Sequence, residues 1–330
     1  MTRILSYNIL AGGKKRVDQL TNIISSAQPD IVGLVEAYNP QVVEELARRL
    51  GMDYRMSESF TDYYNGQTAL LSRLPILETR SHHLSDRHTR SVLEASIEED
   101  GHKLTVFIAH LTAAFYQSRG GDALRRREVQ AILRIMTSKK GTPHLLMGDF
   151  NAIAPGDRLK ASQLLRYLIN MDQQYTRNPY EDLGHPNLDS VVPKQLRFLY
   201  PFMHMIARSK MLCALLDATG SLYASRGSIS TLRKAGYIDC FRLKHPKDPG
   251  FTCPASSLAG RIDYIFASPE LAERLSASYI VTQGSEFRGD EASDHLPVFA
   301  AFGDRVEATN KPVHGLTTHR PLDVDVIDNV

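Results

Sequence analysis

Two polar residues, at positions 149 and 151, directly follow a short apolar run. The run at 145–148 reads Leu-Leu-Met-Gly and comes just after Pro143. A run this short, bounded by a proline and a glycine, is typical of a buried strand. In an extended chain, Asp149 and Asn151 would direct a carboxylate and an amide to the same side, which is how a site holds a phosphate or a polarised water. A strand end followed by an Asx turn has the same sequence, so this stretch alone leaves both interpretations open.

Other predicted strands carry, or lie next to, polar side chains for which a purely structural strand has little use. These residues, with the apolar runs beside them, are Asn8 in 4–9, Glu36 in 31–36, His110 after 104–109, Asp263 in 261–267, and Asp294 and His295 before 298–302. Strand ends in a layered α/β fold can converge on one crevice. We therefore expect these residues to form one site together with those at 149 and 151.

The chemistry that this set offers is that of a hydrolase. Mg²⁺ and Mn²⁺ prefer carboxylate and water oxygens, so Glu36 is a candidate metal ligand. A zinc site would need more histidines or cysteines at close spacing than the sequence shows. His295 could act as a general acid or base, and Asp263 could fix its tautomer and stabilise the imidazolium.

The surrounding pattern is that of an α/β protein. Over the first fifty residues, strands at 4–9 and 31–36 alternate with amphipathic helices at 17–27 and 42–50, the second ending at Gly51. Short strands and turns follow up to residue 111, with a hairpin turn signal at 99–101. Further helices are predicted at 123–137, 159–171, 228–235 and 269–275, with one or two within 196–216, and further strands at 261–267 and 298–302.

These elements predict one large domain. Strand signals resume after the helical region at about 155–235, so we interpret that region as a helical insertion or cap within a single catalytic domain spanning 1–303. Residues 304–330 are rich in Thr, Asn, Asp and Pro and show little periodicity, which predicts a C-terminal tail.

Composition and charge are those of an ordinary soluble protein. Of the 330 residues, 42% are hydrophobic, and 39 basic against 37 acidic residues give a net charge of only +2, so no overall attraction to nucleic acid or anionic membrane is expected. No secretory signal and no apolar run of membrane-spanning length is evident. Three cysteines, without metal-ligand spacing, favour reduced thiols. We expect a cytoplasmic monomer.

Two further stretches are interpreted by their usual roles. The run Arg125-Arg126-Arg127 on the helix at 123–137 is usually a solvated face, although it could also hold an anionic substrate. The apolar stretch around Met203 to Met211 is more often core than a lipid-binding surface.

Several short segments, taken in order, resemble those of one family. They are 6–9 (Ser-Tyr-Asn-Ile), 34–37 (Leu-Val-Glu-Ala), 69–76 (Ala-Leu-Leu-Ser-Arg-Leu-Pro-Ile), 109–111 (Ala-His-Leu), 148–151 (Gly-Asp-Phe-Asn), 261–266 (Arg-Ile-Asp-Tyr-Ile-Phe) and 293–298 (Ser-Asp-His-Leu-Pro-Val). The ordered set resembles the endonuclease/exonuclease/phosphatase superfamily, the DNase I-like fold shared by exonuclease III, neutral sphingomyelinases and inositol-polyphosphate 5-phosphatases. It covers nearly the whole chain apart from 155–235 and the tail.

The resemblance implies a fold and a cofactor. The fold is a four-layer αββα sandwich, in which two mixed β-sheets pack face to face with helices outside. The reaction is hydrolysis of a phosphoester with a divalent cation, Mg²⁺ or Mn²⁺. By match to the family pattern, Glu36 is the metal ligand, and Asn8 and Asp294 lie near the metal.

The resemblance also implies catalytic roles. Asp149 and Asn151 position the nucleophilic water and the phosphate. His295 pairs with Asp263 and contacts the phosphate or takes a proton, and His110 is a further phosphate contact. A dianionic transition state needs a cation and several donors in place beforehand, which agrees with this set. Whether Asp149 or His295 deprotonates the water stays open.

Two details of the family pattern bear on the substrate. Many members have Gln before the metal-binding Glu, where this chain has Val35, a position that we expect outside the metal's ligands. Abasic-site endonucleases usually have Tyr where this chain has His110, and His110-Leu111 resembles the DNase I, sphingomyelinase and phosphatase branches instead. With the small net charge, this favours a small or lipid-like phosphoester as the partner over duplex DNA. The alternatives are an endonuclease or exonuclease, and a non-catalytic binding relative, which should lack one or more of the site residues.

Overall fold

Two mixed β-sheets form the centre of the molecule. The computed structural model describes residues 1–59, 67–85, 88–113, 119–177 and 185–304, and within them each sheet has six strands. The first sheet has the order β11 (Leu275–Ile280), β12 (Val298–Phe302), β1 (Thr2–Asn8), β2 (Ile31–Val35), β4 (Thr68–Ser72) and β3 (Asp53–Met56). The second has the order β5 (Ile76–Ser85), β6 (His88–Glu99), β7 (His102–His110), β8 (His144–Asp149), β10 (Asp263–Ala267) and β9 (Ile238–Asp239). The pairs β1–β2 and β7–β8 are parallel, and the other neighbouring strands pair antiparallel.

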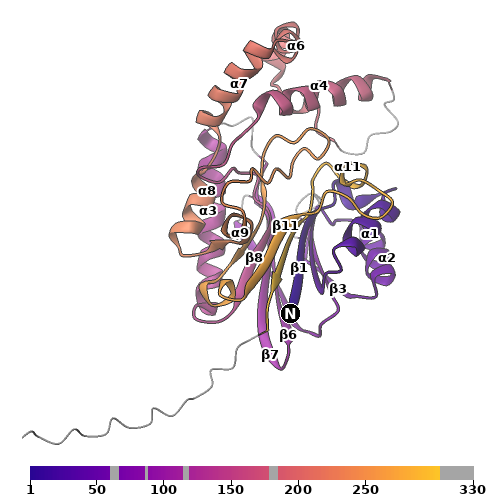
Figure 1. Ribbon diagram of the computed structural model, residues 1–330, viewed down its shortest axis with the longest axis vertical. Helices are drawn as coiled ribbons and strands as arrows, with labels where there is room; N and C mark the ends of the chain where they lie inside the picture. The colour runs from indigo at the N-terminus through magenta and orange to yellow at the C-terminus, as the bar shows by residue number, and fades with distance from the viewer. Residues whose placement is uncertain (60–66, 86–87, 114–118, 178–184, 305–330) are drawn as a thin grey trace, which may run out of the picture.

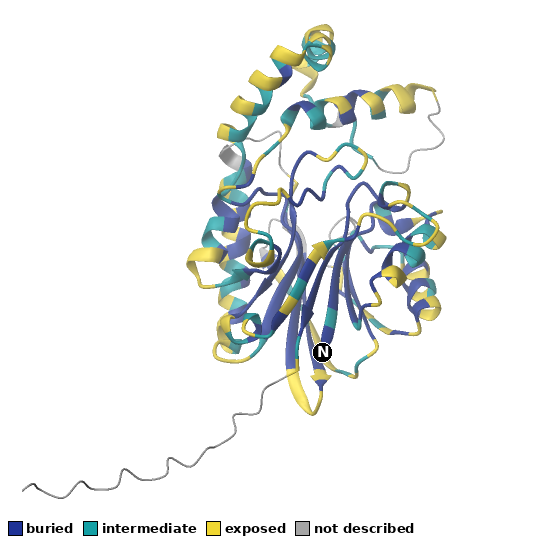
Figure 2. Ribbon diagram, in the orientation of Figure 1, coloured by how far each residue is buried: buried dark blue, intermediate teal, exposed yellow. Residues whose placement is uncertain are grey.

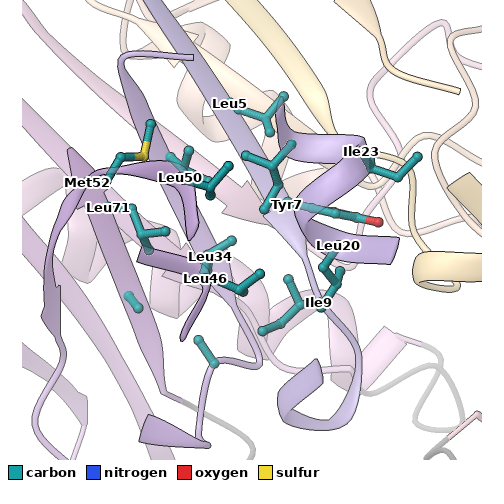
Figure 3. Close-up of a cluster of buried hydrophobic side chains, with 14 of the residues drawn as sticks. Leu5, Tyr7, Ile9, Leu20, Ile23, Leu34, Leu46, Leu50, Met52 and Leu71 are labelled. Carbon is teal, nitrogen blue, oxygen red and sulfur yellow. The ribbon is translucent and has the colours of Figure 1, made fainter. Parts of the chain in front are cut away.

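Helices cover the outer faces of both sheets, so the predicted four-layer sandwich is confirmed. Helices α1 (Val17–Ser26) and α2 (Pro40–Leu50) pack on the first sheet, and α3 (Arg119–Met136) and α8 (Gly227–Lys234) lie on the opposite side, on the second (Figure 1). Figure 3 shows the cluster under α1 and α2, where Leu20 and Leu46 meet Tyr7 and Leu34 of the first sheet. Helix α2 ends, as predicted, at Gly51, which has the left-handed conformation that commonly terminates a helix.

The space between the sheets is filled by every second residue of the central strands. The shared core contains Ile4 of β1, Leu104, Val106 and Ile108 of β7, Leu145 and Met147 of β8, and Ile265 and Ala267 of β10. Because side chains alternate along a strand, the same face continues into Asn8, His110, Asp149 and Asp263. These four polar residues thus form the last layer of the inter-sheet core, at the end where β1, β7 and β8 terminate.

Several helices lie between β8 and β9 in the sequence and project beyond that end of the sheets (Figure 1). They are α4 (Ala161–Arg177), α5 (Leu188–Val191), the 3-10 helix η6 (Lys194–Leu199), α6 (Tyr200–Arg208) and α7 (Lys210–Tyr223). The predicted helical character of 159–171 and 196–216 is therefore confirmed. Short helices also occur at η1 (Ala11–Gly13), η4 (Thr137–Lys139), α9 (Cys240–Lys244), α10 (Pro269–Ala272) and α11 (Gly289–Ala292). In the described part of the chain, no helix combines the length and the apolarity needed to cross a membrane.

Two of the predicted boundaries differ from the structure, and one strand was not predicted. The strand predicted at 261–267 begins at Asp263, because Arg261 turns its side chain into a buried ion-pair network. The helix predicted at 269–275 ends at Ala272, and Leu275 already starts β11. That edge strand reads Leu-Ser-Ala-Ser-Tyr-Ile, too polar to give a strand signal. The predicted tail lies outside the described residues from position 305 onward.

Gly148 of β8 lies against the backbone of Ala109 of β7, where there is no room for a side chain. It has a φ of 140°, and a Cβ there would lie 1.8 Å from the carbonyl oxygen of Ala109. We expect Gly148→Ala to lower the free energy of unfolding by about 4 kcal/mol, because backbone strain and steric overlap add. The control is Gly141→Ala, at φ 81° with no atom within 4 Å of the new Cβ, where about 1 kcal/mol is expected. Urea denaturation measures both, and equal losses would contradict the clash.

A candidate active site between the two sheets

The candidate residues come from both sheets and meet at one end of the sandwich. His110, Asp149 and Asp263 are direct neighbours across β7, β8 and β10, since His110 is in register with Asp149, and Asp149 with Asp263. Asn8 reaches them from the first sheet, with its amide Nδ2 3.1 Å from Asp149 Oδ2. Strand pairing and sheet packing therefore bring together side chains that lie far apart in the sequence.

Asp149 is the centre of this arrangement. Its Oδ2 lies 3.6 Å from His110 Nε2 and 3.8 Å from His295 Nε2, and only 1% of the residue is exposed. Burial, together with the nearby carboxylate of Asp263, raises the pKa of Asp149 to about 7. Asp149 is thus a carboxylate whose negative charge its surroundings only partly balance.

The strand of Asp149 does not continue to Asn151. Asn151 has a φ of 47°, which takes it out of the extended conformation, and its backbone N–H donates to Asp149 Oδ1 at 2.8 Å. The side-chain Nδ2 donates to the carbonyl oxygen of Leu111 at 2.9 Å. Of the two interpretations that the sequence left open, the stretch therefore has the Asx turn and not the extended strand end. The turn itself holds the Asp149 carboxylate in place.

His295 and Asp263 form the hydrogen-bonded pair that the sequence predicts. His295 Nδ1 lies 2.9 Å from Asp263 Oδ2, and both residues are buried. The ring's other nitrogen, Nε2, faces Asp149 and lies 3.9 Å from Asp294 Oδ1. Burial opposes a charge on the ring, but the carboxylates around it, Asp263 foremost, hold the pKa of His295 well above its ordinary value.

Ser293 and Thr252 support this pair and were not among the predicted site residues. Ser293 Oγ donates to the carbonyl oxygen of Asn8 at 2.7 Å and accepts from the His295 backbone N–H at 3.2 Å, so it joins the histidine loop to β1. Thr252 Oγ1 accepts from the backbone N–H of Asp263 at 3.3 Å. The sequence could have indicated Ser293, because it belongs to the segment 293–298 that resembles the family. The sequence around Thr252 contains no comparable motif.

Glu36 lies beside this group. Its Oε1 accepts from Asn8 Nδ2 at 3.2 Å, and its Oε2 accepts from the backbone N–H of Ala11 at 2.7 Å. Glu36 has a φ of 58°, in the left-handed region that L residues other than Asn and Asp seldom adopt. Strain of this kind is found where the surrounding structure fixes a side chain for a function.

The donor set fits a hard divalent cation. Four carboxylates, from Glu36, Asp149, Asp263 and Asp294, are linked through Asn8 and His295 by contacts no longer than 3.9 Å. Ligand atoms of Asp149, Asp263 and His295 all lie within 4.8 Å of one another. Asp263 already holds His295, and Asn8 Oδ1 accepts from the backbone N–H of Leu10 at 3.0 Å. The candidate oxygen donors for Mg²⁺ or Mn²⁺ are therefore the carboxylates of Glu36, Asp149 and Asp294.

Arg261 anchors the backbone that presents Asp263. Its guanidinium, on a residue 1% exposed, donates to both carboxylate oxygens of Asp239 at 2.8 and 2.6 Å and to Asp157 Oδ2 at 2.8 Å. The same group lies 4.5 Å from the centroid of the Tyr264 ring. Asp239 ends β9, and Asp157 lies in the chain that follows β8. The network therefore links segments from both neighbouring strands to Arg261, just before the start of β10.

We expect Arg261→Met to lower the free energy of unfolding by about 3–5 kcal/mol. The change leaves the buried Asp239 without its guanidinium, whereas Asp157 keeps its contact with Arg242. The matched control, Arg288→Met, breaks a pair at the protein surface and should cost less than about 1 kcal/mol. Urea denaturation compares the two, and an equally small loss in both would show that the network does not stabilise the fold.

The run Arg125-Arg126-Arg127 does not present a uniform solvated face. Arg126 and Arg127 are exposed, but Arg125 is 1% exposed and its Nη1 donates to the carbonyl oxygen of Thr112 at 2.8 Å. Thr112 Oγ1 in turn donates to Glu128 Oε1 at 2.5 Å. Arg125 therefore fixes the chain that leaves β7 after His110.

Comparisons with known proteins agree with this geometry. A family model described as the Endonuclease/Exonuclease/phosphatase family matches residues 5–295. An AP endonuclease from Archaeoglobus fulgidus has the same fold, with a TM-score of 0.59 at 17% identity over 92% of this chain and 99% of that one. The 3′ phosphatase NExo from Neisseria, bound to a product DNA hairpin, has a TM-score of 0.56 at 18% identity over the same shares of both chains.

A third structure, humanized TDP2 from D. rerio, has a TM-score of 0.56 at 16% identity over 92% of this chain and 99% of that one. At these identities the likeness is one of fold. The curated proteins include no match to this sequence. The family model, which spans nearly the whole chain, shows that the protein belongs to the Endonuclease/Exonuclease/phosphatase family.

Proposed function

We propose that this protein is a divalent-metal-dependent phosphoester hydrolase. Members of its family hydrolyse phosphoester bonds. The observation that carries the proposal is the buried Asp149 carboxylate, which faces the imidazoles of both His110 and His295. The His295–Asp263 pair beside it has the geometry of a catalytic imidazole oriented by a carboxylate. With Glu36, Asp149, Asp263 and His295 all present, a non-catalytic relative is the weaker alternative.

The roles follow from the hydrogen bonds. Asp263 accepts the Nδ1–H of His295, which leaves Nε2 to face the substrate. His110 and His295 contact the phosphate and stabilise the charge that develops on its oxygens. Asp149, held by the Asx turn at Asn151, orients the water that attacks phosphorus. As the new P–O bond forms, the ester P–O bond breaks. The attacking water gives up one proton to the site and the leaving oxygen takes up one proton, so the net change is the addition of one water across the ester bond.

The cation would be held by Glu36, with Asn8 and Asp294 beside it. When bound, Mg²⁺ or Mn²⁺ would neutralise the phosphate's negative charge and stabilise the transition state. The excess of buried carboxylate over cationic groups at the site supports this assignment. The left-handed backbone of Glu36 and its two hydrogen bonds position this carboxylate beforehand.

For the substrate, we propose a small or lipid-like phosphoester rather than duplex DNA. The support is the net charge of only +2, which is low for a protein that must neutralise many backbone phosphates. The test is a panel of plasmid DNA, bis-p-nitrophenyl phosphate, p-nitrophenyl phosphate and sphingomyelin, each with Mg²⁺ and with EDTA. Faster hydrolysis of plasmid DNA than of the other substrates would instead identify a nuclease. The structure from Archaeoglobus fulgidus is named as an endonuclease.

A further inference from the structure

Helices α6 and α7, with the 3-10 helix η6 before them, expose large apolar side chains to solvent. Much of α6 and α7 has the yellow colour of exposed residues in Figure 2. The exposed fractions are 74% for Phe198, 51% for Phe202, 50% for Met205, 76% for Met211, 60% for Leu215 and 82% for Leu222. Within each helix these residues recur at intervals of three, four or seven, so they line one side of it. We refer to these six residues as the apolar face. Met205 and Met211 belong to it, which corrects the expectation that the stretch from Met203 to Met211 is core.

The opposite sides of the same helices are already covered. Met203 and Ala207 of α6 pack against the buried cluster around Tyr167 and Leu168 of α4. On α7, the buried Cys213 faces α4 as well, with its Sγ 3.4 Å from Arg166 Nη2. Helices that are apolar on two sides are normally buried on both. Among the described residues, none forms the second layer that the composition of the apolar face requires.

The charged residues around the apolar face indicate what kind of partner would supply that layer. Between Asp189 and Asp217 the chain has no acidic residue, yet it contains Lys194, Arg197, Arg208 and Lys210. Arg197 pairs with Asp189, whereas Lys194, Arg208 and Lys210 are exposed. Exposed Phe, Leu and Met with interspersed Lys and Arg, and no acid, are the composition of a helix that lies in the interface of an anionic membrane.

We propose that the apolar face and its flanking cations bind the surface of an anionic lipid bilayer. The apolar side chains would enter the boundary between headgroups and acyl chains, and the cations would contact lipid phosphates. A second copy of the chain fits less well, because a symmetric contact would set the three exposed cations Lys194, Arg208 and Lys210 against the same three on the partner. The helices project from the end of the sheets at which the candidate site lies (Figure 1), so bound lipid would be on the same side as that site.

Vesicle flotation tests this binding without any need for turnover. The full chain is mixed with vesicles of phosphatidylcholine alone or with about one third phosphatidylglycerol, and the fraction that floats is measured. We expect flotation with the anionic vesicles and little with the neutral ones. Met211→Gln with Leu222→Gln should weaken the partition coefficient by about tenfold or more, and Lys194→Gln with Lys210→Gln should weaken it by about tenfold on anionic vesicles.

The matched control is Leu77→Gln with Leu243→Gln, on β5 and α9, where the side chains are 50% and 54% exposed. This variant should float like the unaltered chain. Absence of flotation with anionic vesicles, equal flotation with neutral ones, or equal loss in the control variant would overturn the proposal. So would a dimer, seen by sedimentation velocity, that the Met211 and Leu222 changes dissociate while vesicles are not bound, because a second copy would then cover the apolar face.

Discussion

Replacing Asp263 with asparagine is expected to lower kcat for phosphoester hydrolysis by about 10²–10⁴-fold. Asp263 Oδ2 lies 2.9 Å from His295 Nδ1 and accepts a hydrogen bond from it. An asparagine that turned its NH₂ group toward the ring would favour the wrong tautomer, and one that turned its oxygen would no longer stabilise a charged imidazole. The measurement is kcat on the best substrate of the panel, with circular dichroism to show that the variant is folded.

A double-variant cycle separates this role from a general loss of structure. If Asp263 acts only through His295, Asp263→Asn combined with His295→Gln should be about as slow as the slower single variant. The control is Asp290→Asn, at a carboxylate that pairs with Arg288 on the surface, and its kcat should be unchanged. Losses that multiply in the double variant would contradict the proposed pair, because they would assign independent roles to the two residues.

Removing divalent cations is expected to abolish turnover, and restoring them should stabilise the fold through Glu36. At a Mg²⁺ concentration of about 100 times Kd, binding to the folded state adds about 2.7 kcal/mol to the free energy of unfolding. That increase should be observed in the unaltered chain and should be absent in Glu36→Gln, because the neutral side chain attracts Mg²⁺ far less. Thermal unfolding with and without Mg²⁺ measures the effect independently of activity.

The matched control for this experiment is Glu44→Gln, an exposed position on α2. It should keep the full stabilisation by Mg²⁺. Stabilisation that is the same in Glu36→Gln as in the unaltered chain would show that Glu36 is not a ligand. Turnover that persists in EDTA would contradict the metal requirement itself.

The alternation of side chains along the strands made most of the site predictable. His110, Asp149 and Asp263 each continue a run of core residues on one face of a strand, and Asn8 ends a strand of the other sheet. With the two packed sheets that the family resemblance implies, these residues were expected to meet. The pairing of His295 with Asp263 also follows the ordered segments that resemble the family. The meeting of the strand residues and the His295–Asp263 pair were predictable because they depend on periodicity and on short motifs that can be read from the sequence.

What could not be predicted depends on contacts between distant segments. Arg261 lies outside the strand predicted for it because its guanidinium pairs with Asp157 and Asp239. Arg125 is buried because it donates to the chain after β7. A local sequence pattern predicts neither contact. The conformation of Asn151 depends on the carbonyl oxygen of Leu111, forty positions earlier. Met211 belongs to an apolar stretch, and the side of α7 that is covered depends on the contact of Cys213 with α4.

The most direct test of the account is hydrolysis by Asp149→Asn, measured beside the unaltered chain on the panel substrate that is turned over fastest. Asparagine keeps the size of the side chain, and its oxygen can still accept from the backbone of Asn151. The account predicts Mg²⁺-dependent turnover by the unaltered chain and a loss of at least about 10²-fold in the folded variant. Unchanged turnover in Asp149→Asn, or no turnover of any phosphoester by the unaltered chain with Mg²⁺, would contradict the central claim that this site hydrolyses phosphoesters.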